Sequence, residues 1–261
     1  MRRLGRWTRA RVFLRSFLVQ ASWNYRTLIG SGFAFALVPA FREVFRGDDR
    51  AVDEAVRRHA RLFNSHPYLS PVALGAVAVL EAEGEGAEVI ERFKTALRGS
   101  LGTLGDRLIW AGWRPLCVLF ALAVLLAGAA WWVGVLVFLA LYNAGHIAVR
   151  VLGYQLGLRE GLRIGEQIRS PGVMRVQRAL PTLGSFLAGL LLPLVVAGPF
   201  VQGAALTEAL GDRGRLPLVW LAAGAAGALV GLRFGARVRT PVVIALWIIT
   251  LGGILAGMDG S

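Results

Sequence analysis

The stretch Leu116–Leu141, LCVLFALAVLLAGAAWWVGVLVFLAL, decides the fold class of this chain of 261 residues. It carries no charged residue from end to end. About 20 apolar residues of α-helix are enough to cross the hydrocarbon core of a lipid bilayer, and the stretch exceeds that length. It therefore predicts a helix that spans a membrane.

Three further apolar blocks follow this first span. Leu180–Val201 has no charged residue, while Leu216–Leu232 and Pro241–Met258 are close to the shortest length that can span. The chain is 56% hydrophobic, above the roughly 45–50% of an average soluble domain. Four buried helices of a large soluble core are the alternative, but such helices normally carry a polar stripe. The sequence thus predicts an all-α integral membrane protein with its transmembrane helices in the C-terminal half.

Charge and cysteine content limit the partners of this protein. The formal net charge is +13, and arginine supplies nearly all of the positive charge because Lys94 is the sole lysine. Anionic lipid is a sufficient acidic partner for a basic membrane protein, so we expect contact with a lipid bilayer and no nucleic acid. Cys117 is the sole cysteine, so no internal disulfide forms, and its apolar block lacks the electropositive setting of a reactive thiolate.

The N-terminal segment combines arginine with short apolar runs. Residues 2–20 alternate arginines with apolar residues such as Trp7 and Phe13, which is typical of a basic amphipathic helix at a membrane surface. The alternative is a segment that simply packs on the rest of the chain. Residues 28–41 are apolar but too short and too interrupted by glycine for a plain span, so they predict a re-entrant or interfacial hairpin.

A charged amphipathic helix comes next. An aspartate of the Gly47-Asp48-Asp49 turn supplies the N-cap of a helix predicted over residues 51–63. Pro67 disfavours the helical state of His66 and ends that helix. A moderately apolar segment follows.

The sequence predicts a single domain with two halves. Residues 1–115 form a half with amphipathic and re-entrant helices that carries polar site residues, and residues 116–261 form the transmembrane half. Within the first half, Tyr68–Leu80 is the moderately apolar segment and Glu81–Glu91 predicts an acidic surface loop.

Arginine positions predict the orientation of the spans. Residues 142–179 and 233–239 are rich in arginine and should face the cytoplasm, while the charge-balanced segment 202–215 should face outward. The arginine-rich N-terminus also favours the cytoplasm, and a single first span cannot connect two cytoplasmic sides. Either an apolar segment before residue 82 crosses the membrane, or the N-terminal half lies folded inside the membrane protein. We prefer the second interpretation.

Three short motifs place polar side chains among apolar, glycine-rich neighbours. Burying a polar group without a partner costs free energy. Aromatic rings support the apolar face of a sugar, while amide, hydroxyl and carboxylate groups bond its hydroxyls. The alternative for each residue is a helix cap or a satisfied turn. The candidate sugar-contacting residues are Gln20, Trp23, Asn24, Asn64, Ser65, His66 and Asp106.

The residues contain no recognisable catalytic machinery. We find no nucleophile–base pair, no metal-ligand cluster and no phosphate-binding loop, so neither a cofactor nor a metal is expected. His59, His66 and His146 lie on separate segments, and no acid partner can be assigned to any of them. A phosphohistidine role is therefore disfavoured, and a membrane enzyme has no residues to support it.

A series of short motifs follows one another over roughly residues 10–200. The series comprises Val12-Phe13-Leu14-Arg15-Ser16, Gln20-Ala21-Ser22-Trp23-Asn24-Tyr25, Gly32-Phe33-Ala34-Phe35, Val38-Pro39-Ala40, Arg58-His59, Phe63-Asn64-Ser65-His66-Pro67, Gly102-Thr103-Leu104-Gly105-Asp106, Ile109-Trp110, Arg114-Pro115 and Tyr142-Asn143 to Gly153-Tyr154. In this order and spacing, the chain resembles enzyme IID, a membrane subunit of the mannose/fructose/sorbose-type sugar phosphotransferase system.

The resemblance implies a role in a hetero-oligomeric complex of a bacterial inner (plasma) membrane. In this family, cytoplasmic IIA and IIB phosphocarriers hold phosphate on histidines. The multi-pass membrane subunits IIC and IID bind a mannose-type hexose and pass it inward by alternating access, and IIB then phosphorylates it. IID itself is not phosphorylated. The seven candidate residues match the family's polar motifs, so the resemblance implies that they contact the sugar or line its path.

Two departures from the family pattern keep a second function open. The family usually has proline after the Gly-Asp pair, where this chain has Arg107, and the region after residue 200 is shorter than in typical members. The alternative is a diverged IID-like membrane interaction or regulatory protein that moves no sugar. The sequence does not identify the sugar.

Overall fold

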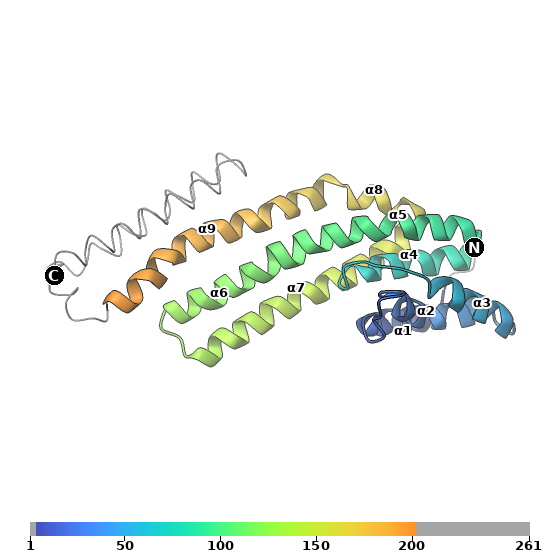
Figure 1. The fold of residues 1–261 in the computed structure, drawn as a ribbon, viewed down its shortest axis with the longest axis horizontal. Helices are drawn as coiled ribbons and strands as arrows, with labels where there is room; N and C mark the ends of the chain where they lie inside the picture. The colour runs from blue at the N-terminus through green and yellow to red at the C-terminus, as the bar shows by residue number, and fades with distance from the viewer. Residues whose placement is uncertain (1–3, 202–261) are drawn as a thin grey trace. The chain divides into compact units, whose positions relative to one another are not determined.

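The computed structural model describes residues 4–201 of the chain, and every regular element in that range is a helix (Figure 1). The predicted all-α class is thereby confirmed for the described residues. The predicted spans Leu216–Leu232 and Pro241–Met258 lie outside the described residues, as do segments 202–215 and 233–239.

Within the described range, α-helices alternate with the 3-10 helices η1 and η3 and with the π-helix η2. In chain order the elements are α1 (Arg6–Arg15), η1 (Ser16–Leu18), α2 (Gly30–Val44), α3 (Asp49–His59), α4 (Ser70–Glu83), α5 (Ala87–Gly105), η2 (Asp106–Trp113), α6 (Arg114–Leu126), α7 (Trp131–Glu160), η3 (Gly161–Arg163), α8 (Ile164–Ile168) and α9 (Pro171–Val201).

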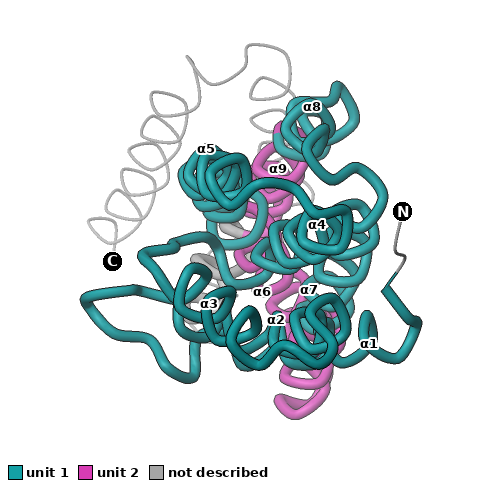
Figure 2. The backbone as a smooth tube through the Cα atoms, turned by 90° about the vertical axis from the view of Figure 1, so that its right-hand side faces the viewer, with its two compact units in different colours: residues 1–111, 142–177 teal, residues 112–141, 178–261 magenta. Residues whose placement is uncertain are grey.

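The chain divides into two compact units, which Figure 2 colours separately. Unit 1 comprises residues 1–111 and 142–177, and unit 2 comprises residues 112–141 and 178–261. Helices α7 and α9 therefore each contribute residues to both units. All the predicted site residues belong to unit 1.

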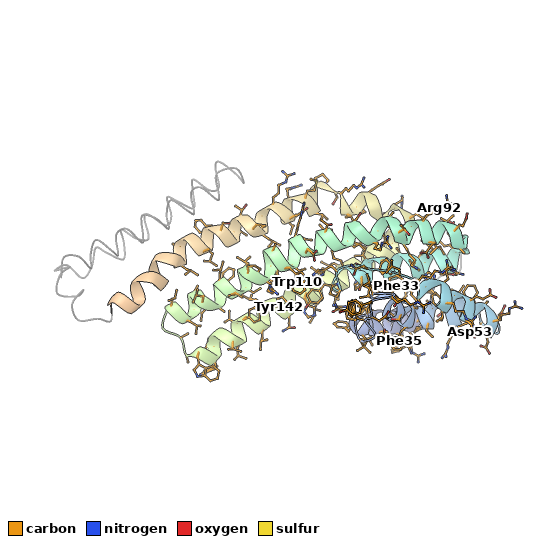
Figure 3. All side chains as sticks on the ribbon, in the orientation of Figure 1. Phe33, Phe35, Asp53, Arg92, Trp110 and Tyr142 are labelled. Carbon is orange, nitrogen blue, oxygen red and sulfur yellow. The ribbon has the colours of Figure 1, made fainter. Side chains whose placement is uncertain are left out.

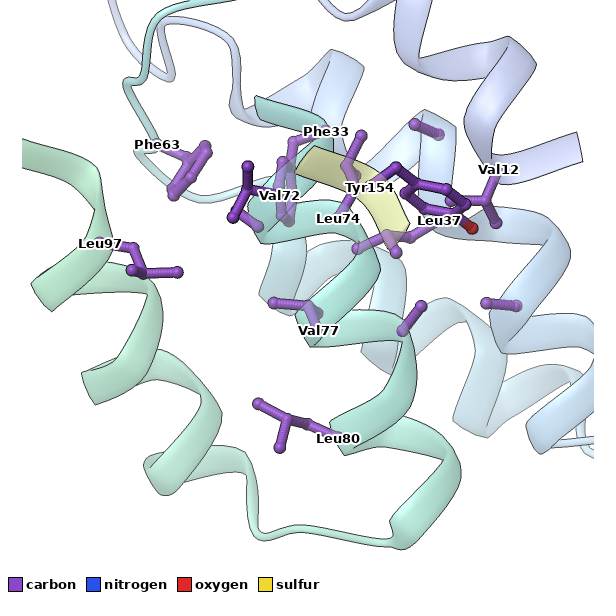
Figure 4. Close-up of a cluster of buried hydrophobic side chains, with 14 of the residues drawn as sticks. Val12, Phe33, Leu37, Phe63, Val72, Leu74, Val77, Leu80, Leu97 and Tyr154 are labelled. Atoms are coloured by element: carbon purple, nitrogen blue, oxygen red, sulfur yellow. The ribbon is translucent and has the colours of Figure 1, made fainter. Parts of the chain in front are cut away.

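Helix α4 is central to the hydrophobic core of unit 1. Nearly every residue of α4 is buried, as expected for a helix that is apolar on all sides. Leu74 and Val77 of α4 belong to the same cluster as Phe33 and Leu37 of α2 and Tyr154 of α7 (Figure 4). One core thus holds together helices that are far apart in the sequence.

The hairpin predicted for residues 28–41 is wrong, because this segment forms the single continuous helix α2. Its glycines allow close contact instead of breaking the helix. A Cβ atom on Gly30 would overlap the backbone carbonyl of Arg61, and one on Gly32 would overlap that of Val19. The backbones of the two neighbouring loops can therefore lie directly against the start of α2.

Proline inside α2 is compensated by a side chain of α1. Pro39 has no backbone N–H, so the carbonyl group of Phe35, four residues earlier, loses its helical hydrogen bond. Nη1 of Arg15 donates to this oxygen at 3.2 Å, and the guanidinium lies 4.6 Å from the centroid of the Phe35 ring. Arg15 thereby ties α1 to α2.

Helix α3 begins at Asp49, two residues before the predicted start, and ends sooner than predicted. The Asp48 carboxylate accepts a hydrogen bond from the backbone N–H of Ala51 at 2.9 Å, which confirms the predicted N-cap. The helix ends at His59 and not at the predicted residue 63. Phe63 instead pairs its backbone with the loop that precedes α2.

Helices α4 and α7 contact each other through glycine. A Cβ atom on Gly157 of α7 would overlap the backbone carbonyl of Val72, and one on Gly75 of α4 would lie too close to the backbone carbonyl of Tyr154. Small residues of this kind let two helix backbones approach closely.

Unit 2 contains the stretch predicted as one span, and that prediction is wrong. Leu116–Leu141 folds into α6, a tight turn and the start of α7. Gly128 adopts φ +91, a left-handed conformation that glycine reaches without a steric penalty. Gly134 of α7 lies so close to Leu125 of α6 that an added Cβ would be 2.8 Å from that side chain. The stretch therefore forms the tip of a helical hairpin.

Two helices of the described chain are long and apolar enough to cross a membrane, Ala87–Leu126 and Trp131–Ile168. Only 22% and 6% of their most apolar windows are buried inside the protein, whereas the core helices of a soluble protein are mostly buried. Exposed apolar helix faces of this extent require lipid or another protein as cover. Leu180–Val201 lies within α9, and its side chains are described only as far as Leu191.

Candidate functional site

Asn24 builds the loop between η1 and α2. Its Nδ2 donates to the carbonyl oxygen of Ser22 at 3.1 Å and to Oγ1 of Thr27 at 2.8 Å. Its Oδ1 accepts from the backbone N–H groups of Arg26 at 3.0 Å and Thr27 at 2.9 Å. The loop itself therefore satisfies this amide, which is the turn-forming role typical of asparagine.

Backbone pairing joins this first loop to the loop that carries the second motif. Leu28, which has a left-handed φ of 55, exchanges two backbone hydrogen bonds with Asn24. The N–H of Ile29 donates to the carbonyl of Phe63 at 3.1 Å, and the N–H of Phe63 donates to that of Thr27 at 3.2 Å. Two motifs about 40 residues apart in the chain thus lie side by side.

His66 brings the second motif to the third. Gly105 at the end of α5 lies directly against the His66 side chain, so that a Cβ atom there would overlap the imidazole. The His66 ring packs edge-on against Tyr68 at 5.2 Å and Trp110 at 5.9 Å between centroids. The absence of a side chain at Gly105 therefore leaves room for His66, and Asp106 follows directly in the chain.

His66 is neutral at physiological pH. Burial lowers the pKa of this histidine to about 4; the Asp106 carboxylate opposes the shift and the Arg150 charge adds to it. Nδ1 of His66 accepts a hydrogen bond from the backbone N–H of Tyr68 at 3.2 Å, so the proton of the neutral ring resides on Nε2. That N–H donor is buried and has no hydrogen-bond partner in the described part of the chain.

His66 belongs to an aromatic–polar cluster within unit 1. The hydroxyl groups of Tyr68 and Tyr142 lie 2.9 Å apart, and the Tyr68 ring stacks on His146 at 4.6 Å and 24°. Figure 3 labels Trp110 and Tyr142 of the cluster, together with residues that do not belong to it. The cluster comprises Ser16, Phe17, His66, Tyr68, Trp110, Tyr142, His146 and Arg150.

Arg150 occupies the interior of this cluster, with only 4% of its surface exposed. Its Nη1 donates to the carbonyl oxygen of Ser16 at 3.1 Å. Its guanidinium lies 4.6 Å from the centroid of the Phe17 ring and 5.1 Å from that of Tyr68. Two aromatic faces thus stabilise a buried cation that no carboxylate neutralises among the described residues.

Four buried polar atoms of the cluster lack a hydrogen-bond partner among residues 4–201: Oγ of Ser16, Nε2 of His66, Nδ1 of His146 and Nε of Arg150. Each such atom costs about 1–3 kcal/mol relative to a satisfied one. Native proteins contain few of them, so four in one cluster need an explanation.

The seven predicted site residues have different surroundings. Ser65 and His66 are buried, Asn24 is half-buried, and Gln20, Trp23, Asn64 and Asp106 are exposed. The structure brings the Asn24 loop, the His66 loop and the Gly105-Asp106 motif together. No described hydrogen bond or ring contact joins the side chains of Gln20 or Trp23 to His66 or Asp106, and Trp23 packs on Tyr25.

Sequence reasoning missed the partners of His66 that come from α7. Tyr142, His146 and Arg150 are spaced four residues apart and therefore share one helix face. This spacing was visible in the sequence as polar residues at i, i+4 and i+8 of an apolar helix. The neighbouring Tyr142-Asn143 motif had been used only for the resemblance.

A second buried network lies between α3 and α4 and corrects two predictions. Glu81 belongs to α4 and is only 4% exposed, and the surface loop predicted at Glu81–Glu91 is reduced to residues 84–86, because residues 81–83 end α4 and residues 87–91 begin α5. Oε1 of Glu81 lies 2.6 Å from both Nη2 of Arg58 and Nε2 of His59. His59 therefore has an acid partner, contrary to the expectation that none could be assigned.

Burial has opposite effects on the two ends of this network. Burial lowers the pKa of His59, against the raising effect of its bond to Glu81. Burial alone would raise the pKa of Glu81, but hydrogen bonds from His59 and Arg58 outweigh it and lower that pKa. The network therefore holds an ionised carboxylate and a neutral imidazole that donates through Nε2.

The described residues form no group of three or more His, Cys, Asp or Glu side chains that could hold a metal ion. What the aromatic–polar cluster offers chemically is ring faces together with hydroxyl, imidazole and guanidinium groups. Such a set recognises a polyhydroxylated ligand or an adjoining protein surface.

Comparisons with known proteins agree with the motif pattern. The sequence profile of the PTS system mannose/fructose/sorbose family IID component matches residues 3–208. The mannose-specific EIID component of Escherichia coli (strain K12) is 32% identical over 199 residues, which cover 71% of this chain and 70% of that protein. The sorbose-specific EIID component of Klebsiella pneumoniae is 32% identical over 212 residues, covering 75% and 76% of the two chains.

Solved structures share the fold. A chain from the complex of the mannose transporter ManYZ with microcin E492 aligns over 98% of both chains, with a TM-score of 0.58 and 23% identity. A second membrane protein structure aligns over the same shares with a TM-score of 0.63 and 24% identity. The motif order, the profile match and the relatives at 32% identity lead to one conclusion: this chain belongs to the mannose/fructose/sorbose family of PTS IID components, the membrane subunits of a sugar transport system.

Proposed function

We propose that this chain binds a mannose-type hexose and, together with a IIC subunit, passes it across the membrane by alternating access. The observation that carries the proposal is the group of four unsatisfied polar atoms in the aromatic–polar cluster. Rings and unpaired hydrogen-bonding groups in one place are the chemistry of sugar recognition.

The burial of these four atoms supports a site that changes its conformation during transport. Because they are enclosed, no sugar hydroxyl reaches them without a change in the packing of Phe17, Tyr68 or Tyr142. A second arrangement that opens the cluster to sugar or water would satisfy these atoms and recover part of their cost. Two arrangements of similar free energy are what alternating access requires.

The exposed candidate residues fit a role in the path and not in the enclosed cluster. Asn64 and Asp106 present an amide and a carboxylate to the surroundings, next to the buried Ser65 and His66. We assign Gln20, Trp23, Asn64 and Asp106 to the walls of the path, where the sugar or the IIC subunit covers them. Asn24 shapes the loop that holds them.

In the proposed function, this chain performs no phosphoryl transfer itself. The PTS relatives name components of systems that carry mannose or sorbose. The cytoplasmic IIA and IIB proteins would transfer the phosphate, and this chain would act as a subunit of a hetero-oligomer in the inner membrane. The histidines of the described part support this division, since His59 is engaged by Glu81 and His66 is buried.

The helical hairpin supplies a membrane topology. Two spans joined by a turn at Gly128 begin and end on the same side of the bilayer. The arginine-rich N-terminus and residues 142–179 would then both face the cytoplasm, as the arginine distribution predicts. In this topology the two cytoplasmic ends no longer conflict, because Leu116–Leu141 would connect two spans instead of forming one.

Uptake of labelled mannose tests the proposal. Cells that supply IIA, IIB and the IIC partner would express the chain with Asn64→Ala, Asp106→Ala or Tyr142→Phe. Loss of a hydrogen bond to the sugar is worth about 1 kcal/mol or more, so we expect uptake to fall by about fivefold or more in each variant. Asp53→Ala, at an exposed position of α3, is the matched control and should leave uptake unchanged.

Two results would contradict the proposal in different ways. Undiminished uptake with both Asn64→Ala and Asp106→Ala would show that the path is wrongly assigned. Absence of uptake with the unmodified chain, despite normal amounts of chain and partner in the membrane, would favour the regulatory alternative.

A further inference from the structure

A cavity of about 280 Å³ lies between α1 and the C-terminal part of α7, within unit 1. One part of its lining is apolar, with Ala10 and Phe13 of α1. Arg6 and Arg9 of α1 and Gln155 of α7 also line it. None of the residues that line this cavity is acidic.

The two arginines have no direct acidic partner among the described residues, although the Glu43 carboxylate interacts with the charge of Arg9 at longer range. Both arginines are exposed. The backbone between them is fixed, because the Tyr154 hydroxyl donates to the carbonyl oxygen of Arg9 at 2.9 Å. Their positions on α1 therefore hold two positive charges at one end of an apolar groove.

The side chains around the cavity are of the kinds found where a protein meets lipid headgroups. Trp7 and Leu14 of α1 are 73% and 64% exposed, and exposed aromatic and aliphatic side chains on a basic helix are typical of contact with a membrane surface. The residues of α7 that line the cavity lie between Arg150 and Arg159, in the more charged C-terminal part of the candidate span Trp131–Ile168. Basic pockets at this position suit an anionic headgroup.

We propose that this cavity binds one anionic phospholipid, with its phosphodiester held by Arg6, Arg9 and Gln155 and the start of an acyl chain lying along Ala10 and Phe13. Guanidinium groups recognise phosphate oxygens through paired N–H donors. A zwitterionic lipid carries its own cation next to the phosphate, so its headgroup gains less from the two arginines. The lipid would fasten α1 to α7 from outside.

Lipid retention tests the site. The full chain, purified with its IIC partner in detergent, is incubated with phosphatidylglycerol or with phosphatidylcholine, and native mass spectrometry measures the lipid retained. We expect the unmodified chain to retain phosphatidylglycerol preferentially. Arg6→Gln and Arg9→Gln should each weaken its retention about fivefold, the effect of one interfacial arginine.

Arg11→Gln is the matched control, because Arg11 is an exposed arginine of the same helix that does not line the cavity. It should retain phosphatidylglycerol as the unmodified chain does. Ala10→Leu changes no charge and fills the groove, so it should also reduce retention. Equal effects of Arg9→Gln and Arg11→Gln, or equal retention of the two lipids, would overturn the proposal, since surface charge alone would explain either result.

Discussion

Glu81 shows how a single buried side chain organises its surroundings. It holds Arg58 and His59 at 2.6 Å each, although these residues precede it by 23 and 22 positions. The acidic composition of residues 81–91 concealed this role, because Glu83, Glu85 and Glu88 are exposed as predicted. Only the three-dimensional fold places one of these carboxylates against a cation and an imidazole.

Glu81→Gln should destabilise the protein strongly. Removal of the carboxylate charge leaves the Arg58 cation without its buried counterion, and breaking a buried ion pair costs about 3 kcal/mol or more. Unfolding in a denaturant series, performed on the purified chain in detergent, measures the change. Glu54→Gln removes an exposed partner of Arg50 and should cost no more than about 0.5 kcal/mol. Similar costs for both variants would refute the buried network.

The lowered pKa of His66 makes stability depend on pH. The unfolded chain protonates this histidine near pH 6.5, the folded chain only near pH 4. Between these values the unfolded state binds more protons, so stability falls as pH drops from about 6.5 to 4, by up to roughly 3 kcal/mol from this group. His66→Asn keeps an acceptor for the Tyr68 N–H. In this variant the thermal unfolding midpoint should depend less on pH across this range. An unchanged pH profile would contradict the assignment.

At the scale of helices, the sequence predicted element type better than element boundaries. Helix α3 and its N-cap were found because the cap and the amphipathic face are local features. The hairpin at Gly128 was missed because the parts of both helices next to the turn, within Leu116–Leu141, lack charge. Trp131 and Trp132, 75% and 53% exposed, were the available signal, since tryptophan favours the bilayer interface over the middle of a span.

The contact between α4 and α7 depends on glycine and should not tolerate a methyl group. Gly157→Ala would force the new Cβ onto the backbone of α4, which cannot move as a flexible side chain does. We expect a loss of about 1–3 kcal/mol in the free energy of unfolding.

Gly102→Ala is the control, because a Cβ atom at this helical glycine meets nothing within 4 Å. Alanine is the better helix former by about 1 kcal/mol, so this variant should be neutral or stabilised. A destabilisation by Gly102→Ala equal to that of Gly157→Ala would show that close packing of α4 and α7 is not the cause.

At the scale of the whole molecule, the order of the motifs indicated the family, whereas the aromatic–polar cluster could be recognised only in the three-dimensional structure. The seven candidate residues came from segments that are interrupted by polar groups. Tyr142, His146 and Arg150 come from a helix that reads as apolar, and a sequence does not show which face of such a helix meets Tyr68. The division into residues 1–115 and 116–261 stays a prediction.

The proposed topology predicts which positions a membrane-impermeant thiol reagent can reach. In a Cys117→Ala background, cysteine at Ala129 should react from outside intact cells. Cysteine at Glu85 or Arg169 should react only after the cells are opened. Protection of Ala129→Cys together with reaction of Arg169→Cys from outside would restore a single span through Leu116–Leu141.

The hydrogen bonds from α7 to the N-terminal segment can form only late in biosynthesis. Arg9 and Ser16 receive their bonds from Tyr154 and Arg150, which follow them by 145 and 134 residues. At roughly 5–20 residues per second, a ribosome needs about seven to thirty seconds to make the intervening chain. During that interval α1 can contact α2 but lacks its hydrogen bonds from α7, so the growing chain must keep a basic, aromatic helix from binding elsewhere until its last partners emerge.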